Sequence, residues 1–178
     1  MTKPILYLDV DGVLIQFRED RTRLHYEYHM GGFPANRVGD FIQWADRNFE
    51  VRWLTCWAMH GAMNEHAHEK LQAITWETIP NWDNPKSWAA TGDKTRGIDF
   101  DDPRPWFWLD DETKHDRPLL PEKFGDRLIK TNSSVDPDAL LYSAREMYDR
   151  LHYEFKTYIE KPCWASDKQK FFYGGFYE

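Results

Sequence analysis

Short apolar runs alternate with amphipathic segments along most of this chain, and that alternation is the feature that most constrains its fold. The runs are bounded by proline, glycine or acidic residues, as buried parallel strands are, and they cover residues 5–11, 49–55, 74–80, 105–112 and 126–132. Apolar residues recur at helical spacing between and after them, at 38–45, 63–74 and 140–151. Strands separated by helices predict an α/β fold with a doubly wound parallel sheet.

Two stretches interrupt this alternation. Residues 15–35 are polar and predict a flap or long loop, while residues 81–105 have little periodicity and predict a loop with one helical turn. The length of 178 residues fits one domain, and no linker divides the chain. We therefore expect a core over residues 1–160 and an aromatic tail over residues 161–178 that is not a separate domain.

The last predicted helix has the clearest ends. Asp136 can cap it, Pro137 suits its first position, and Pro162 is expected to end it.

Aromatic residues are unusually frequent, with nine tryptophans in the chain. Six of these lie on or beside predicted core elements, where packing explains them: Trp44, Trp53, Trp57, Trp76, Trp106 and Trp108. The tail carries a second group, which could dock on a sheet edge, form a dimer contact or stack on a base: Phe171, Phe172, Tyr173, Phe176 and Tyr177.

The charge and the cysteines exclude several classes of protein. A formal net charge of −7 repels a phosphate backbone and an anionic membrane, although it is compatible with a local basic pocket for one phosphate. No apolar run approaches the roughly 18 residues that span a bilayer, and the N-terminus lacks the pattern of an export signal. The two cysteines form no disulfide framework, and Cys56 lies in an apolar run typical of a buried reduced thiol. We expect a cytoplasmic protein with no membrane partner.

Two acids stand at the end of the first apolar run, in the segment DVDG. Side chains alternate along a strand, so Asp11 can act beside Asp9 only if the chain turns after Asp9, and Gly12 helps it to turn. One carboxylate could then attack an electrophile while the other donates a proton to the leaving group. Two close acids with different pKa values are a known source of this division of labour.

Other polar residues stand at or before the ends of later runs. Thr55 could hydrogen-bond a phosphate oxygen, and the pair Asp110 and Asp111 is suited to a hard cation. A lysine before the fourth run could neutralise phosphate charge; Lys94 is favoured over Lys86, which lies farther back beside a proline. Ligands of such sheets bind at the carboxyl ends of the strands, so these residues predict a single site.

These motifs, in this order, resemble the four motifs of the haloacid dehalogenase (HAD) superfamily of phosphotransferases. The resemblance covers residues 4 to about 155, and LDVDGVL is one of the more specific short signatures of this kind. The segment RPWFWLDDE is also similar to small bacterial and phage HAD-like proteins. The resemblance implies a three-layer Rossmann-like fold, a central parallel sheet with strand order 5-4-1-2-3, and a minimal cap or none.

The resemblance also implies a Mg²⁺-dependent phosphomonoester hydrolase. Asp9 would be the nucleophile that forms an aspartyl-phosphate, and Asp11 would be the general acid and then the general base. Thr55 and Lys94 would bind the transferred phosphoryl group. The residues implied to hold Mg²⁺ are Asp9, Asp11 through its backbone carbonyl, Asp110 directly and Asp111 through water.

The substrate is expected to be bulky. Residues 15–35 and 81–93 are the insertions where a cap would stand, and neither is long enough to form a core of its own, so the site should be open. Within the first insertion, the basic and aromatic residues that could contact substrate are Arg18, Arg21, Arg23, His25, Tyr26 and Tyr28. With Trp57, the tyrosines could stack on a base, which favours a nucleotide or a nucleic-acid end. The alternative is a non-catalytic phosphate- or partner-binding module on the same fold.

Three other groups of polar residues need a simpler interpretation. His66 and His68 lie in a histidine-rich segment but point about 200° apart on a helix, which disfavours a zinc site. Asp101 and Asp102 follow no apolar run and predict a solvated turn. Glu112 could orient a metal ligand or face solvent.

Overall fold

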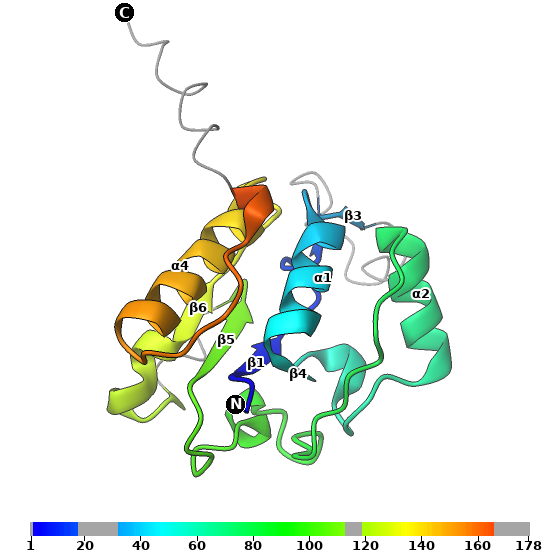
Figure 1. Ribbon diagram of the computed structural model, residues 1–178. Coiled ribbons are helices and arrows are strands. Elements are labelled where there is room, and N and C mark those ends of the chain that lie inside the picture. The colour runs from blue at the N-terminus through cyan, green and yellow to red at the C-terminus, as the bar shows by residue number, and fades with distance from the viewer. Residues whose placement is uncertain (1, 18–31, 113–118, 166–178) are drawn as a thin grey trace, which may run out of the picture.

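The computed structural model describes residues 2–17, 32–112 and 119–165, and these form an α/β fold around a parallel sheet (Figure 1). The sheet has four strands in the order β4-β1-β5-β6, and every neighbouring pair is parallel. The strands are β1 (Ile5–Leu8), β4 (Glu50–Trp53), β5 (Trp106–Asp110) and β6 (Leu128–Lys130). This arrangement is consistent with a Rossmann-like fold.

One expected strand does not form. The order 5-4-1-2-3 required a strand at residues 74–80 beyond β4, but helix α2 (Glu65–Thr75) runs into that segment and irregular chain follows it. Ile79 is buried in the core, yet its backbone N–H donates to the Gln72 side chain at 3.2 Å rather than to a strand. The apolar pattern there therefore reflects a buried loop, and the prediction of a third strand is wrong.

The three predicted helices are present with slightly different bounds, and the residues expected to begin and end the last one do not do so. They are α1 (Val38–Asn48), α2 and α4 (Ala139–Tyr153). Helix α4 begins after Asp138, and Asp136 instead accepts a hydrogen bond from the Asp138 backbone N–H at 2.9 Å. The helix ends well before Pro162, because the chain turns back at Lys156, whose φ is 52°.

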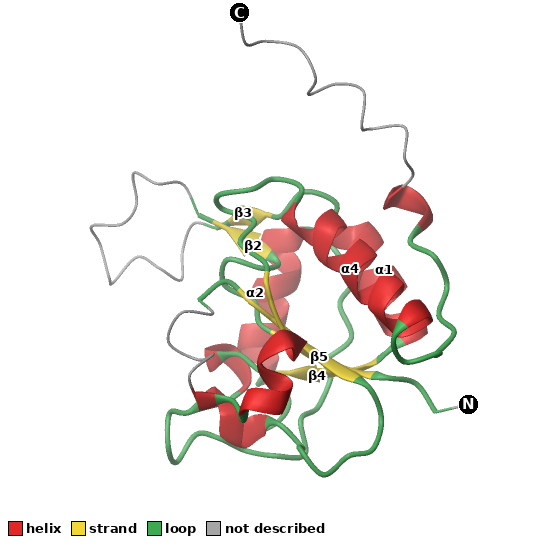
Figure 2. Cartoon of the chain, turned by 90° about the vertical axis from the view of Figure 1, so that its left-hand side faces the viewer, coloured by secondary structure: helices red, strands yellow, loops and turns green. Residues whose placement is uncertain are grey.

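Alternation along the strands separates two apolar layers. Leu6 and Leu8 of β1 belong to the larger core cluster. Helices α1 and α4 pack against each other and contribute to this cluster on the same face of the sheet (Figure 2). Ile5 and Tyr7 belong to a second cluster on the other face. Loop residues such as Trp88 and Ile98, together with Phe124 of a 3₁₀ helix, supply much of that second layer. The 3₁₀ helices are η2 (Cys56–Ala58), η3 (Lys94–Gly97), η5 (Glu122–Arg127) and η6 (Cys163–Ala165).

The tryptophan prediction holds with one exception. Trp44, Trp53, Trp106 and Trp108 are buried and Trp57 is half-buried, whereas Trp76 is 81% exposed at the left-handed end of α2. Cys56 is also exposed, so the expected buried thiol is wrong. The five aromatic tail residues that the sequence singled out lie outside the described residues.

The expected flap is described only at its base. Strands β2 (Ile15–Gln16) and β3 (Phe33–Pro34) pair antiparallel on either side of it. Residues 18–31, with all the basic and aromatic flap residues named above, lie outside the described part. The second irregular stretch, residues 81–105, contains the expected helical turn, which is η3 (Lys94–Gly97). Among the described residues, none of the helices is long and apolar enough to cross a bilayer.

Candidate active site

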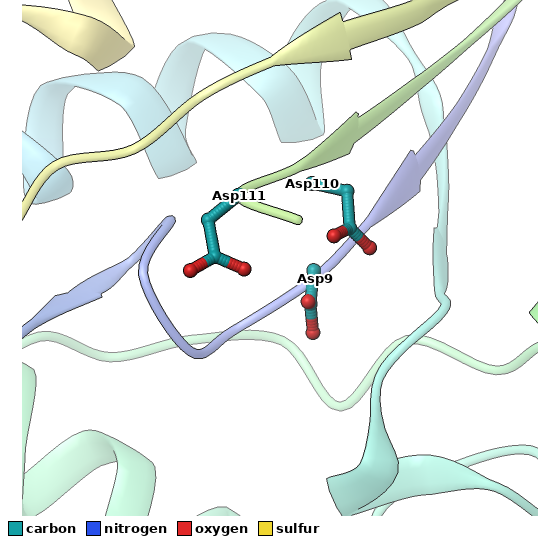
Figure 3. A group of neighbouring side chains, drawn as sticks. All are labelled: Asp9, Asp110 and Asp111. Carbon is teal, nitrogen blue, oxygen red and sulfur yellow. The ribbon is translucent and has the colours of Figure 1, made fainter. Parts of the chain in front are cut away.

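Three carboxylates meet where two neighbouring strands end (Figure 3). Asp9 follows the last residue of β1, Asp110 ends β5 and Asp111 comes next. Because Leu8 pairs with Leu109 in parallel register, the two chain segments leave the sheet side by side. One carboxylate oxygen from each aspartate lies within 4.8 Å of the others.

A tight turn after β1 carries Asp11 toward the same edge. The carbonyl of Val10 accepts three backbone N–H groups in succession, those of Val13, Leu14 and Ile15, at 3.2, 2.9 and 3.1 Å. Gly12 has φ 72°, and a Cβ atom there would lie 2.2 Å from a carboxylate oxygen of Asp111. Glycine is therefore required at this position both by the backbone conformation and by the close approach of Asp111.

The Asp11 carboxylate lies apart from the three-carboxylate group and has a different partner. Its Oδ2 accepts a hydrogen bond from the indole Nε1 of Trp57 at 3.0 Å. The sequence predicted Trp57 as a packing or base-stacking residue and missed this contact.

Lys94 lies against two of the acids. Its Nζ is 2.7 Å from Oδ2 of Asp9 and 2.6 Å from Oδ2 of Asp110. Lys86 instead pairs with Asp99 at 2.9 Å on the half-exposed surface. Of the two lysines that the sequence left as alternatives, the structure brings Lys94 to the acids.

A buried asparagine that the sequence did not identify holds the Lys94 turn in place. The Asn84 amide donates to the backbone carbonyls of Trp53 in β4 and Gly97 in η3, at 2.9 and 3.2 Å. Gly97 is packed so closely that an added Cβ would lie 2.5 Å from Leu54. These contacts connect the loop that carries Lys94 to the end of the neighbouring strand.

Thr55 lies at the same edge of the sheet. It is fully buried just beyond β4, and its Oγ1 accepts the backbone N–H of Trp57 at 3.4 Å, so it caps η2. Because β4 and β1 are parallel neighbours, Thr55 and Asp9 both follow the carboxyl ends of their strands.

Ser133, which the sequence did not identify, stabilises the turn that carries Asp11. Its backbone N–H donates to the Gly12 carbonyl and its Oγ donates to the Val13 carbonyl, both at 2.7 Å. The only sequence signal was a serine pair shortly after an apolar strand.

The acids carry more negative charge than Lys94 offsets. Burial, with a further contribution from the charge of Asp110, raises the pKa of Asp9 although Lys94 lowers it. Burial and the charge of Asp110 raise the pKa of Asp111 to about 6. Burial lowers the pKa of Lys94, but Asp9 and Asp110 outweigh it, so that its pKa is raised. The lysine is therefore charged, and the site has a deficit of positive charge.

A divalent cation fits this deficit. Within the described residues, Asp9, Asp110 and Asp111 are the group placed to hold a metal ion. Ionised together with Lys94, the four side chains carry a formal charge of −2. Their donors are all carboxylate oxygens, which favour hard cations such as Mg²⁺ over zinc.

The remaining polar candidates have structural contacts. The Nε2 atom of His68 lies 2.7 Å from the Ile79 carbonyl. Asp102 forms an ion pair with Arg104 at 2.7 Å, so the prediction of a simple solvated turn is wrong there. Glu112 is exposed, and its backbone N–H donates to Oδ1 of Asp110 at 2.9 Å.

Comparison with protein-family models, with curated proteins and with solved structures gave no match.

Proposed function

We propose that this protein is a Mg²⁺-dependent phosphomonoester hydrolase of the HAD type that acts through an aspartyl-phosphate. The observation that supports it is the convergence of Asp9, Lys94, Asp110 and Asp111 at the carboxyl ends of adjacent parallel strands. The HAD motifs contain these residue types in the same chain order. A cluster that served only stability would pair its charges more evenly.

Asp9 is placed to act as the nucleophile. The Val10 backbone N–H holds Oδ1 at 2.8 Å, and Lys94 lies beside Oδ2. The carboxylate is thus fixed in orientation before substrate arrives. One of its oxygens attacks phosphorus, the bond from phosphorus to the ester oxygen breaks, and the leaving alkoxide takes a proton from Asp11. Water then attacks the acyl phosphate and gives a proton to Asp11, which releases phosphate and restores Asp9.

The repulsion between an anionic nucleophile and an anionic phosphate must be offset. Lys94 supplies one positive charge, and the Thr55 hydroxyl is a hydrogen-bonding group for a phosphate oxygen. Bound by Asp9, Asp110 and Asp111, Mg²⁺ would supply the further positive charge that phosphoryl transfer needs.

The second insertion supports an open site and hence a bulky substrate. Trp88 is buried in the second apolar cluster, and Asn84 is buried against β4 and η3, so these two residues pack into the fold rather than stand out from it. This packing favours an insertion that forms no cap. A nucleotide, a nucleic-acid end or a similarly bulky phosphoester is the substrate class that we propose.

The proposal is tested with a chromogenic aryl phosphate, with and without Mg²⁺ and with chelator. Wild-type protein should release phosphate only when Mg²⁺ is present. Asp11→Asn should accumulate phosphate on Asp9, visible by intact-protein mass spectrometry, because an acidic aryl leaving group departs without a proton while the water step lacks its base. Absence of Mg²⁺-dependent turnover and of the trapped adduct would favour a non-catalytic phosphate-binding module instead.

The substrate class is tested separately with matched phosphoesters. Catalytic efficiency is compared on nucleoside monophosphates, end-phosphorylated oligonucleotides and small sugar phosphates. We expect the first two groups to be preferred. A clear preference for the sugar phosphates would refute the substrate class while leaving the hydrolase proposal intact.

A further inference from the structure

The contact between Trp57 and Asp11 joins two segments that are far apart in the chain. The indole Nε1 lies 3.0 Å from Oδ2 of Asp11, and 46 residues separate the two. Trp57 stands in η2, the short helix capped by Thr55, so its backbone belongs to the phosphate-binding edge of the proposed site.

Trp57 is itself held from several directions. Its backbone N–H donates to Thr55 Oγ1, and its half-buried ring packs against the main core. Lys70 of α2 places its Nζ 5.8 Å from the centre of the same ring. A side chain held in this way can hold the group to which it hydrogen-bonds in one orientation.

The chemistry of the indole makes this hydrogen bond directional. An indole N–H is a donor only, so Oδ2 of Asp11 must accept. The carbonyl oxygen of a neutral carboxylic acid is its stronger acceptor, so this hydrogen bond favours the proton on Oδ1. Trp57 thus distinguishes the two oxygens and limits rotation of the carboxyl group, while Ser133 holds the turn behind it at the Gly12 and Val13 carbonyls.

We infer that Trp57 is a positioning residue that orients the Asp11 carboxyl group for protonation of the leaving group. The inference rests on the proposed hydrolase function. It assigns Trp57 a role in the step that breaks the ester bond, distinct from packing and from substrate stacking.

The test compares Trp57→Phe with a matched control, Trp82→Phe. Both changes keep an aromatic ring and remove an indole hydrogen bond to a carboxylate, because Trp82 Nε1 donates to Asp46 at 2.8 Å. Each variant is measured with an aryl phosphate whose leaving group needs no proton and with an alkyl phosphate whose leaving group does. The quantity compared is kcat/KM, because it reports the steps up to departure of the leaving group.

Trp57→Phe should lower kcat/KM for the alkyl phosphate by about tenfold or more, within the range of general-acid catalysis, and leave the aryl phosphate nearly unchanged. Trp82→Phe should change neither. In an Asp11→Asn background, Trp57→Phe should add no further loss on the alkyl phosphate. Trp57→His, which keeps a ring N–H, should recover part of the alkyl activity and serves as the second variant if the phenylalanine variant does not fold.

Equal losses on both substrates would overturn the inference, since they indicate a structural or binding role. Full alkyl activity in Trp57→Phe would overturn it as well. Wild-type protein inactive on both substrates is a separate result: it refutes the hydrolase function first and the positioning role with it.

Discussion

The two ends of the parallel sheet differ in how their charged side chains are paired. At the amino end, Arg104 contacts both Asp102 and Glu50, and Arg52 also pairs with Glu50. Arg104 lowers the pKa of Asp102 to about 2. Two arginines balance two acids in this group, and the pKa of each acid is lowered, so each is more stable ionised than it would be in water.

At the carboxyl end, acids outnumber bases. Burial and the charge of Asp110 raise the pKa of Asp111 to about 6, and burial raises that of Asp9 although Lys94 lies against it. The same residue type, at opposite ends of the same strands, is thus stabilised as an anion at one end and destabilised at the other. Balanced charges stabilise the fold, whereas unbalanced ones are retained where a ligand or a cation completes them.

The largest expected effect is a loss of activity from a substitution at the carboxyl end that the matching substitution at the amino end does not cause. Asp9→Asn should reduce turnover of an aryl phosphate by about 10³-fold or more, because it removes the nucleophile. The unfolding temperature of the metal-free protein should stay equal or rise, since the raised pKa means that ionised Asp9 is unfavourable in the fold. Asp102→Asn, at the amino end, is the control and should retain turnover. Comparable losses in both variants would contradict the distinction.

Metal binding should reverse the pH dependence of stability at the carboxyl end. Acids whose folded pKa lies above the unfolded value make the metal-free protein less stable as pH rises from about 4 to about 8. Mg²⁺ binds the ionised acids, so its stabilisation should grow with pH, to about 3 kcal/mol at a hundredfold excess over Kd. Thermal unfolding at several pH values, with and without Mg²⁺, measures this.

Asp110→Asn is the matching variant for the metal experiment. It should abolish most of the Mg²⁺-dependent shift, because Asp110 is one of the three carboxylates placed to hold the ion. An unchanged shift in this variant, or a larger shift at low pH than at high pH, would show that the ion binds elsewhere.

Arg104→Met should instead affect stability and not turnover. Since the folded pKa of Asp102 is depressed to about 2, its ion pair stabilises the protein above about pH 4 and is lost as pH falls toward 2, worth about 1 to 2 kcal/mol. The variant should therefore be less stable than wild type at pH 7, with the difference shrinking in acid. Arg37→Met, which removes an exposed pair with Asp40, is the control and should have almost no effect.

The local pattern of the sequence was sufficient for most of the fold. Buried parallel strands need continuous apolar runs, so four strands and three helices could be located from it. Residues 74–80 show where this fails, because Ile79 is buried whether its backbone pairs with a strand or with the Gln72 side chain. An apolar pattern indicates that a segment is buried, but it does not indicate which group its backbone N–H donates to.

The same limit applies to the site. Asp9, Asp110 and Asp111 could be predicted because each follows from the rule that ligands bind at the carboxyl ends of strands. The contacts of Trp57 with Asp11, and of Ser133 with Val13, join residues 46 and 120 positions apart. No local spacing records such pairs, and so the groups that orient the turn became visible only in the folded chain.

The smallest expected effect concerns Lys86, the lysine that does not reach the acids. Its ion pair with Asp99 is half-exposed, with side-chain exposures of 40% and 32%, so solvent screens it and Lys86→Met should cost less than about 1 kcal/mol. Turnover should be unchanged, whereas Lys94→Met should lose most of it because the charge beside Asp9 is removed. Chemical denaturation and kcat/KM, measured on both variants, test this. A loss of turnover in Lys86→Met equal to that in Lys94→Met would mean that Lys86 contacts substrate. The contrast between balanced charges at the amino end of the sheet and unbalanced charges at the carboxyl end would then be wrong.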